Sequence, residues 1–177
     1  MPPIQALEEL EAWHQAADPW QYESHPDDTK RRDILISELP HADYPRVLDI
    51  GCGQGFVTRM LPGRSVIGID VSAGAIAHAK ASADERLDFL QCSLLEAPRR
   101  LEGRFQLVVI TGVLYPQYIG HSLQVVYRIV DRLLAPGGIL ASVHIDAWYR
   151  ARFPYLMLRE HRYPYREYVH RLEIYAK

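Results

Sequence analysis

Two aspartates and three glycines in the first half of the chain have the types and spacing of a ligand-binding site. Asp49 precedes the run Gly51-Cys52-Gly53-Gln54-Gly55, and Asp70 follows Gly51 by nineteen residues. Glycines permit a positive φ and let a ligand approach the backbone. A carboxylate at Asp49 would repel a pyrophosphate and attract an ammonium group, and Asp70 can accept both hydroxyls of a ribose. Each aspartate alone would more often cap a loop, but together these residues predict a site for a nucleoside with a cationic tail.

The glycine spacing argues against a dinucleotide. The dinucleotide fingerprint G-x-G-x-x-G needs glycine at position 56, where this chain has Phe56. A phenylalanine there opposes the close helix–strand packing that the third glycine serves. A nucleotide-linked oxidoreductase is therefore the least favoured of the functions that we consider.

The elements that must position these residues follow a regular alternation. Short β-rich runs separated by helical stretches predict βαβ units, and hence an α/β fold with a doubly wound, mostly parallel sheet flanked by helices. Ligands bind such sheets at the carboxyl ends of the strands, where Asp49 and Asp70 stand. The predicted strands are 46–50, 65–69, 87–91, 105–111 and 139–144, and the predicted helices are 56–61, 73–83 (capped by Ser72) and 121–134.

The two ends of the chain depart from this alternation. Residues 4–17 predict a short amphipathic helix, and a second helix runs from Asp27 or Asp28 to Leu39 behind an acidic cap. The last 30 residues hold six of the eleven tyrosines, and residues 165–175 predict one strand. We favour an edge strand for this end. The alternative is a substrate wall in which Arg150 and Arg152 bind an acidic group.

Composition narrows the functional classes. The 177 residues carry a formal net charge of −2, which removes the usual pull toward nucleic acid or anionic membrane. The acidic N-terminus and the lack of a long apolar run predict neither a signal peptide nor a membrane span, so the cytoplasm is the expected compartment. The two cysteines form no CxxC pair, and no metal site is expected.

The motifs resemble those of the class I S-adenosylmethionine-dependent methyltransferases. The resemblance covers roughly residues 40–145 and is carried by Leu48–Asp70, Val108–Tyr115 and Leu134–Gly138. It implies a Rossmann-like fold, S-adenosyl-L-methionine as cofactor and S-adenosyl-L-homocysteine as product. Many members have an aspartate where this chain has Ser93. The implied cofactor contacts are Gly51, Gly53 and Gly55 with Asp49 at the methionine part, Asp70 at the ribose, Val71, Ser93 and Leu94 at the adenine, and Thr111 near the sulfur.

A finer resemblance concerns the N-terminus. The stretch Asp18–Glu23 followed by Lys30-Arg31-Arg32 is similar to the leader of the nodulation-type N-methyltransferases that act on sugar amines. That likeness implies a lid in which Trp20 and Tyr22 close over the cofactor. Arg31 or Arg32 would pair with the cofactor carboxylate, and we assign Arg32. An equally weighted alternative packs Trp20 in a core and leaves the basic triplet in solvent.

Three residues are candidate bases for the acceptor: Tyr115, His121 and His144. Methyl transfer from a sulfonium depends mainly on alignment, so a base is optional. We expect one domain over 1–177, with an N-terminal helical lid (1–40), a cofactor-binding core (41–145) and a shortened Tyr/Arg-rich C-terminal edge (146–177). The expected function is methylation of a small-molecule N or O acceptor by a monomer or homodimer, with no nucleic-acid or membrane partner. The alternative is a non-catalytic cofactor-binding subunit that supports a partner.

Overall fold

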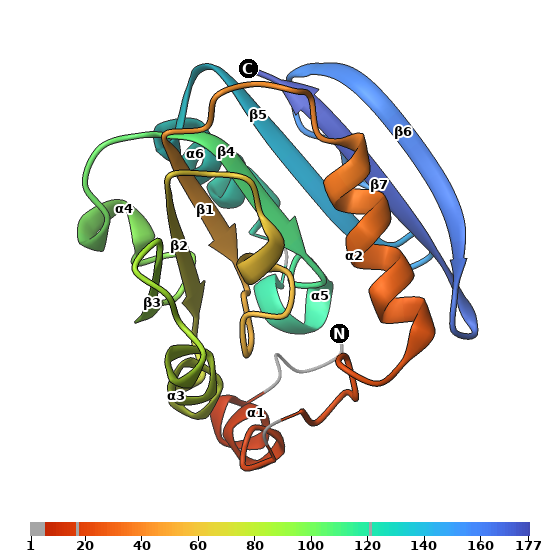
Figure 1. The fold of residues 1–177 in the computed structure, drawn as a ribbon. Coiled ribbons are helices and arrows are strands. Elements are labelled where there is room, and N and C mark those ends of the chain that lie inside the picture. Colours follow the sequence, from red (N-terminus) through yellow and green to blue (C-terminus); the bar gives the residue numbers. More distant parts are fainter. Residues whose placement is uncertain (1–5, 17, 121) are drawn as a thin grey trace.

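A seven-stranded sheet with strand order β3-β2-β1-β4-β5-β7-β6 forms the centre of the molecule (Figure 1). The computed structural model describes residues 6–16, 18–120 and 122–177. Strands β1 to β5 pair in parallel, and β7 runs antiparallel to β5 and β6. This sheet confirms the predicted fold class. The strands are β1 (Arg46–Ile50), β2 (Ser65–Asp70), β3 (Leu87–Gln91), β4 (Phe105–Thr111), β5 (Leu134–Ile145), β6 (Leu156–Tyr165) and β7 (Tyr168–Ala176).

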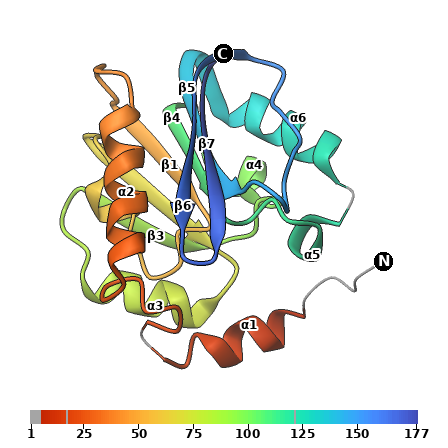
Figure 2. The same ribbon diagram turned by 90° about the vertical axis from the view of Figure 1, so that its right-hand side faces the viewer.

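Helices cover both faces of the sheet, as Figure 2 shows from the side. The inner strands β1 and β4 are buried on both faces, and alternate residues enter opposite cores. Val47 packs with the α2 and α3 side chains, whereas Leu48 packs with those of α4 and α6. In Figure 1, α1 and α5 lie beyond the carboxyl ends of β1, β2 and β4. The helices are α1 (Leu7–Trp13), α2 (Pro26–Glu38), the 3₁₀ turn η1 (Thr58–Met60), α3 (Ala73–Ala81), α4 (Ala97–Arg100), α5 (Pro116–Ile119) and α6 (Leu123–Leu133).

Local chemistry explains the differences from the predicted helices. The helix expected over 56–61 is only a 3₁₀ turn, because Pro62 follows too soon for an α-helix to extend. Helix α2 starts at Pro26, and its N-cap is His25 and not the predicted aspartate. The His25 Nδ1 accepts a hydrogen bond from the Asp27 amide at 3.2 Å. Ser72 caps α3 as predicted. The expected bounds 4–17 and 121–134 reach residues that lie outside the described ones.

The C-terminal end holds two strands where one was predicted. Strand β7 lies inside the sheet between β5 and β6, so the edge strand is β6. Its ion pairs fit an edge, since Arg162 pairs with Glu160 and Asp146. Residues 146–155 form turns and coil without a helix. Within the described residues, no helix is long and apolar enough to cross a membrane.

Candidate functional site

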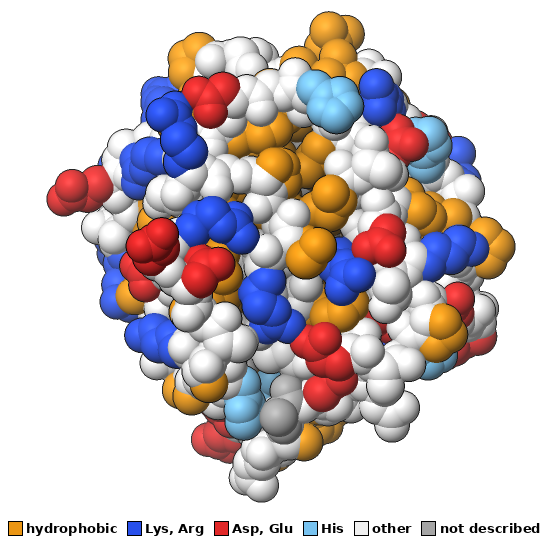
Figure 3. All heavy atoms as spheres, viewed as in Figure 1, with side chains coloured by type: hydrophobic (Ala, Val, Ile, Leu, Met, Phe, Trp, Pro, Cys, Tyr) orange, Lys and Arg blue, Asp and Glu red, His pale blue; other side chains and the backbone are white. Residues whose placement is uncertain are grey.

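A cavity of about 680 Å³ opens at the carboxyl ends of the strands. Its volume lies in the range of sites that enclose a small molecule. The N-terminal segment covers one side, where Leu7, Leu10, Trp20 and Tyr22 line it. On the face of the molecule drawn in Figure 3, Lys and Arg side chains alternate with Asp and Glu instead of forming one basic surface.

The glycine turn, residues 51–55, forms the floor of this cavity. Gly51, Gly53 and Gly55 have φ values of 76°, 53° and 85°, which other residues adopt only with strain. The amides of Gly51 and Cys52 donate to the Ile69 carbonyl at 2.8 and 3.0 Å and so bind the turn to β2. Gly51 and Gly53 line the cavity, but Gly55 does not: it packs against the Phe89 ring, where a Cβ would come within 2.9 Å.

Asp49 lies beneath the glycine turn and is fully buried. Its Oδ2 accepts a hydrogen bond from the Thr58 hydroxyl at 2.7 Å, while Oδ1 has no hydrogen-bond partner among the described residues. Burial, with a smaller contribution from Asp70, raises the pKa of Asp49 to about 6. A buried carboxylate oxygen without a partner, on the wall of a cavity, suits a positively charged ligand group.

Asp70 ends β2 and also faces the cavity. Its Oδ2 accepts from the Gly53 amide at 2.9 Å and its Oδ1 from the Ser72 amide at 3.0 Å. These two backbone donors fix the carboxylate and leave each oxygen able to accept one more bond. Val71, Ser93 and Leu94 line the cavity beside it, and the Ser93 hydroxyl donates to Glu96 at 2.8 Å.

The N-terminal segment carries a chain of aromatic rings over the cavity. Trp20 stacks on Tyr22 with ring centroids 5.7 Å apart, and Tyr22 packs on Phe56 at 5.9 Å. Helix α1 docks through Glu11, which accepts from the Ser72 hydroxyl and from the amides at positions 73 and 74 at the start of α3. Trp20 and Tyr22 both line the cavity, and their role as a lid stays a prediction.

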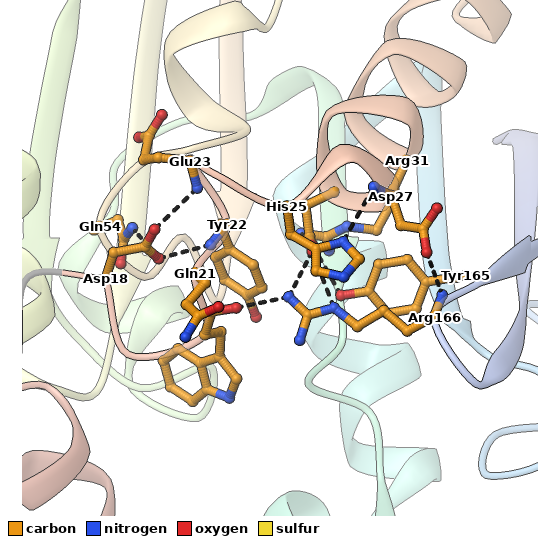
Figure 4. A network of polar contacts seen from close by, with 12 residues as sticks. Asp18, Gln21, Tyr22, Glu23, His25, Asp27, Arg31, Gln54, Tyr165 and Arg166 are labelled. Atoms are coloured by element: carbon orange, nitrogen blue, oxygen red, sulfur yellow. Dashed lines mark hydrogen bonds and ion pairs between the residues drawn. The ribbon is translucent and has the colours of Figure 1, made fainter.

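Asp28 joins three side chains, those of Arg31, Tyr165 and Arg166, which lie side by side in Figure 4. It is fully buried and accepts hydrogen bonds from Tyr165 at 2.8 Å and from Arg166 at 2.7 and 3.2 Å, and it pairs with Arg31 at 3.1 Å. We call these four residues the Asp28 cluster. Arg166 also donates to the Trp20 carbonyl at 2.6 Å, so the β6–β7 turn touches the N-terminal segment directly.

Asp18 joins the N-terminal segment 18–23 to the glycine turn on the other side of Figure 4. Its carboxylate accepts from the amides of Tyr22 and Glu23 at 2.8 and 2.9 Å and from the Gln54 side chain at 2.8 Å. Sequence reasoning missed Asp18, Asp28 and Arg166. Asp28 and Arg166 lie 138 positions apart in the sequence, so no local pattern indicates their contact.

The basic triplet requires a correction. Arg31 lines the cavity, whereas Arg32 does not. The Arg32 guanidinium pairs with Asp33 at 2.9 Å and lies over the Phe56 ring. Arg31 lies over the rings of Tyr22 and Tyr165, and its Nε has no hydrogen-bond partner among the described residues. Neighbouring helix positions differ by about 100° in direction, which is why one arginine points inward and the next does not.

The three candidate bases differ in whether they line the cavity and can take a proton. His144 is buried and is not among the residues that line the cavity. Its Nε2 accepts a hydrogen bond from the Leu114 amide, and its Nδ1 shares a hydrogen bond with the Ser142 hydroxyl. Burial lowers the pKa of His144 to about 3. With both nitrogens engaged, it is not placed to take a proton. Tyr115 does line the cavity, but burial raises its pKa to about 12, so it stays protonated at neutral pH. His121 lies outside the described residues.

Thr111 lines the cavity as expected at the end of β4. Several lining residues that the sequence analysis did not select come from the C-terminal end, among them Trp148, Glu167, Tyr168 and His170. Arg152, proposed to bind an acidic group, instead pairs with Glu160 at 2.7 Å. Trp148 follows β5 by three residues, whereas Glu167 comes from the β6–β7 turn and Tyr168 and His170 come from the start of β7.

Comparisons with known proteins agree with this geometry. The chain is 33% identical over 150 residues to malonyl-[acyl-carrier protein] O-methyltransferase of Enterobacter lignolyticus, across 83% of this chain and 57% of that protein. The chain spans 27% to 57% of the length of several curated relatives that it matches.

The fold is shared with two solved structures. N-methyltransferase NodS of Bradyrhizobium japonicum, in complex with S-adenosyl-L-homocysteine, superposes with a TM-score of 0.77 at 20% identity, over 97% of each chain. A Haloferax volcanii methyltransferase bound to the activator Trm112 gives 0.75 at 16% identity, also over 97% of each chain. Residues 47–138, which contain the glycine turn, Asp70 and β4, match the family described as methyltransferase domain. This chain therefore belongs to that family, the class I S-adenosylmethionine-dependent methyltransferases.

Proposed function

We propose that this protein binds S-adenosyl-L-methionine and transfers its methyl group to an N or O atom of a small molecule. The observation that carries the proposal is the buried Oδ1 of Asp49, which lacks a partner on the wall of a cavity that also presents the glycine turn and Asp70. A ligand with an ammonium group, a carboxylate and a ribose fits these donors and acceptors. The S-adenosyl-L-homocysteine in the NodS structure supports the same ligand class.

Each residue receives a role from its contacts. Asp49 would hold the ammonium group, Asp70 the ribose hydroxyls, and Arg31 the carboxylate through the Nε–H that has no partner among the described residues. Val71, Ser93 and Leu94 would line the adenine. When bound, the cofactor supplies a methyl group already activated on a positively charged sulfur. The protein's share is therefore alignment and exclusion of water, which can be worth about 7–11 kcal/mol in favourable cases.

The lid segment provides the exclusion of water. Trp20 and Tyr22 cover the cavity and are held at both ends, by Asp18 to the glycine turn and by Arg166 to the β6–β7 turn. The enclosed volume of about 680 Å³ has room for a cofactor and a small acceptor, which supports a small-molecule substrate over a polymer. Tyr115 would donate a hydrogen bond to the acceptor instead of removing its proton.

Calorimetric titration with S-adenosyl-L-homocysteine tests the cofactor site. Asp70→Ala should weaken binding by about 1–3 kcal/mol, roughly five- to 150-fold, because each ribose hydroxyl loses an acceptor. Asp88→Ala, on the next strand and not among the cavity-lining residues, is the matched control and should bind as the wild type does. Unchanged affinity in Asp70→Ala would remove Asp70 from the site.

A methyl-transfer assay on pooled metabolites then separates catalysis from binding. Turnover in any pool supports the enzyme. Tight cofactor binding with no turnover in any pool would favour the non-catalytic subunit that supports a partner. Binding of a nicotinamide cofactor, with no affinity for the sulfonium compound, would point to an oxidoreductase instead.

A further inference from the structure

Part of the cavity lining consists of aromatic side chains that the proposed cofactor contacts do not use. Trp148 packs edge-on against Tyr115 at 5.4 Å and against Tyr168 at 5.1 Å, and Tyr115 packs on Tyr118 at 6.1 Å. All four line the cavity, and we call them the aromatic wall. Trp148 is 43% exposed although it is the largest of the four, so its ring presents a free apolar surface.

A carboxylate stands beside this wall. Glu167 lines the cavity from the β6–β7 turn, next to Tyr168, and forms no ion pair with a described residue. The Glu167 carboxylate raises the pKa of the Tyr168 phenol. The neighbouring Arg166 offers no compensation, because Asp28 and the Trp20 carbonyl already engage it.

The charges around the cavity leave one negative charge uncompensated. The lining cations are Arg31 and Arg166, and Asp28 pairs with both. The lining anions are Asp49, Asp70 and Glu167. With Asp28, four negative charges face two positive ones. The lining histidines do not change this balance, since burial lowers the pKa values of His14 and His170. S-adenosyl-L-methionine brings a sulfonium, an ammonium and a carboxylate, a net charge of +1, so the loaded cavity keeps a charge of −1.

We propose that the aromatic wall and Glu167 form the acceptor subsite and that it takes an organic monocation with a flat apolar body. The inference rests on the proposed function, which assigns the cofactor to Asp49, Asp70 and Arg31 and leaves the aromatic wall free. The flat body lies on the exposed Trp148 face. The cationic group has the rings of Trp148 and Tyr168 on one side and the Glu167 carboxylate on the other. Aromatic faces attract cations through the ring quadrupole, and the effect is strongest for tryptophan. An anion of the same shape is repelled by Glu167.

Calorimetry on protein saturated with S-adenosyl-L-homocysteine tests the subsite with matched probes at pH 7.5. The probes are 2-phenylethylammonium as cation, 3-phenylpropanoate as anion and 3-phenylpropanamide as neutral analogue. We expect the cation to bind at least tenfold more tightly than the anion, with the amide between them. Equal or tighter binding of the anion would overturn the proposal, as would a loaded protein that binds none of the probes at 10 mM.

Three variants assign the effect to residues. Glu167→Gln should reduce the cation-to-anion preference at least fivefold, and Trp148→Ala should weaken all three probes about tenfold, with partial recovery in Trp148→Phe. Glu85→Gln, an exposed carboxylate on the loop before β3, is the control and should change nothing. A preference that survives Glu167→Gln would also overturn the proposal. Affinity for S-adenosyl-L-homocysteine is measured first in every variant. This measurement distinguishes a failure of the acceptor-subsite proposal from a failure of the proposed function.

Discussion

The glycine turn and the Asp28 cluster face each other across one cavity but are held in opposite ways. Backbone groups hold the glycine turn, with amides at 51 and 52 bonded to the next strand and the Gly53 amide bonded to Asp70. Side chains hold the Asp28 cluster, where one buried carboxylate joins two arginines and a tyrosine. The first region depends on conformations that few residue types adopt, and the second depends on charge pairing between distant segments. They should therefore fail under different substitutions.

Removing the Asp28 carboxylate should have the largest effect. Asp28→Ala leaves Arg31 and Arg166 without their shared anion, and breaking a buried pair in this way costs about 3–5 kcal/mol of unfolding free energy. Urea denaturation measures it. Asp43→Ala, whose partner Arg64 is mostly exposed, should change stability little. If Asp28→Ala does not fold, Asp28→Asn should fold with an intermediate loss. Wild-type stability in both variants would show that the cluster is not a structural centre.

Alanine substitutions at two glycines of the glycine turn test the backbone side of this comparison. Gly51→Ala combines a positive φ with a Cβ that would come within 2.2 Å of the Val113 Cγ1, so we expect a loss of about 2–4 kcal/mol. Gly53→Ala has a positive φ but no atom within 4 Å of its new Cβ, so only about 1–2 kcal/mol is expected. Chemical denaturation of both variants gives the order. Equal losses would mean that contact with Val113 contributes nothing.

The pH dependence of cofactor binding tests Asp49. Its pKa in the folded protein is raised to about 6, so below pH 6 a proton must leave before the carboxylate can hold an ammonium group. Affinity for S-adenosyl-L-homocysteine should fall by up to about tenfold per pH unit below 6 and level off above it. The unliganded fold responds with the opposite sign, since a raised carboxyl pKa adds stability as pH falls from about 6 toward 4.

Calorimetry between pH 5 and pH 8 checks this dependence, with circular dichroism to confirm that the protein stays folded. In Asp49→Asn the affinity should be weaker at pH 7.5 and nearly independent of pH. A wild-type affinity that stays constant across this range would show that Asp49 does not meet the ligand's cation.

The smallest expected effect concerns the docking of α1. Helix α1 buries none of its residues, and Glu11 joins it to the start of α3 through three donors. Glu11→Ala should lower stability by about 1 kcal/mol, the usual cost of a lost helix cap, and raise amide exchange over residues 7–16. Glu8→Ala, exposed on the same helix, is the control. Unchanged exchange in Glu11→Ala would mean that other contacts hold the helix.

The same division explains how much the sequence could predict. The sheet, the glycine turn and Asp70 follow from local patterns, because strand periodicity and glycine spacing are written in neighbouring residues. Arg31 could not be separated from Arg32 without knowing which face of α2 meets the cavity. The pairing of Asp28 with Arg166 depends on β7 inserting between β5 and β6, which sets the place of the β6–β7 turn. No local pattern encodes that insertion.

The tight turn at Arg166 has a practical consequence for anyone who modifies this chain. Turns between two antiparallel strands usually accept added residues, tags or circular-permutation points with little harm. Here the turn residue reaches the Trp20 carbonyl and the Asp27 and Asp28 carboxylates, so an added segment would separate the two walls of the cavity. A fluorescent label or fusion partner belongs instead near Asp84 and Glu85, where the connecting loop is exposed and far from these contacts.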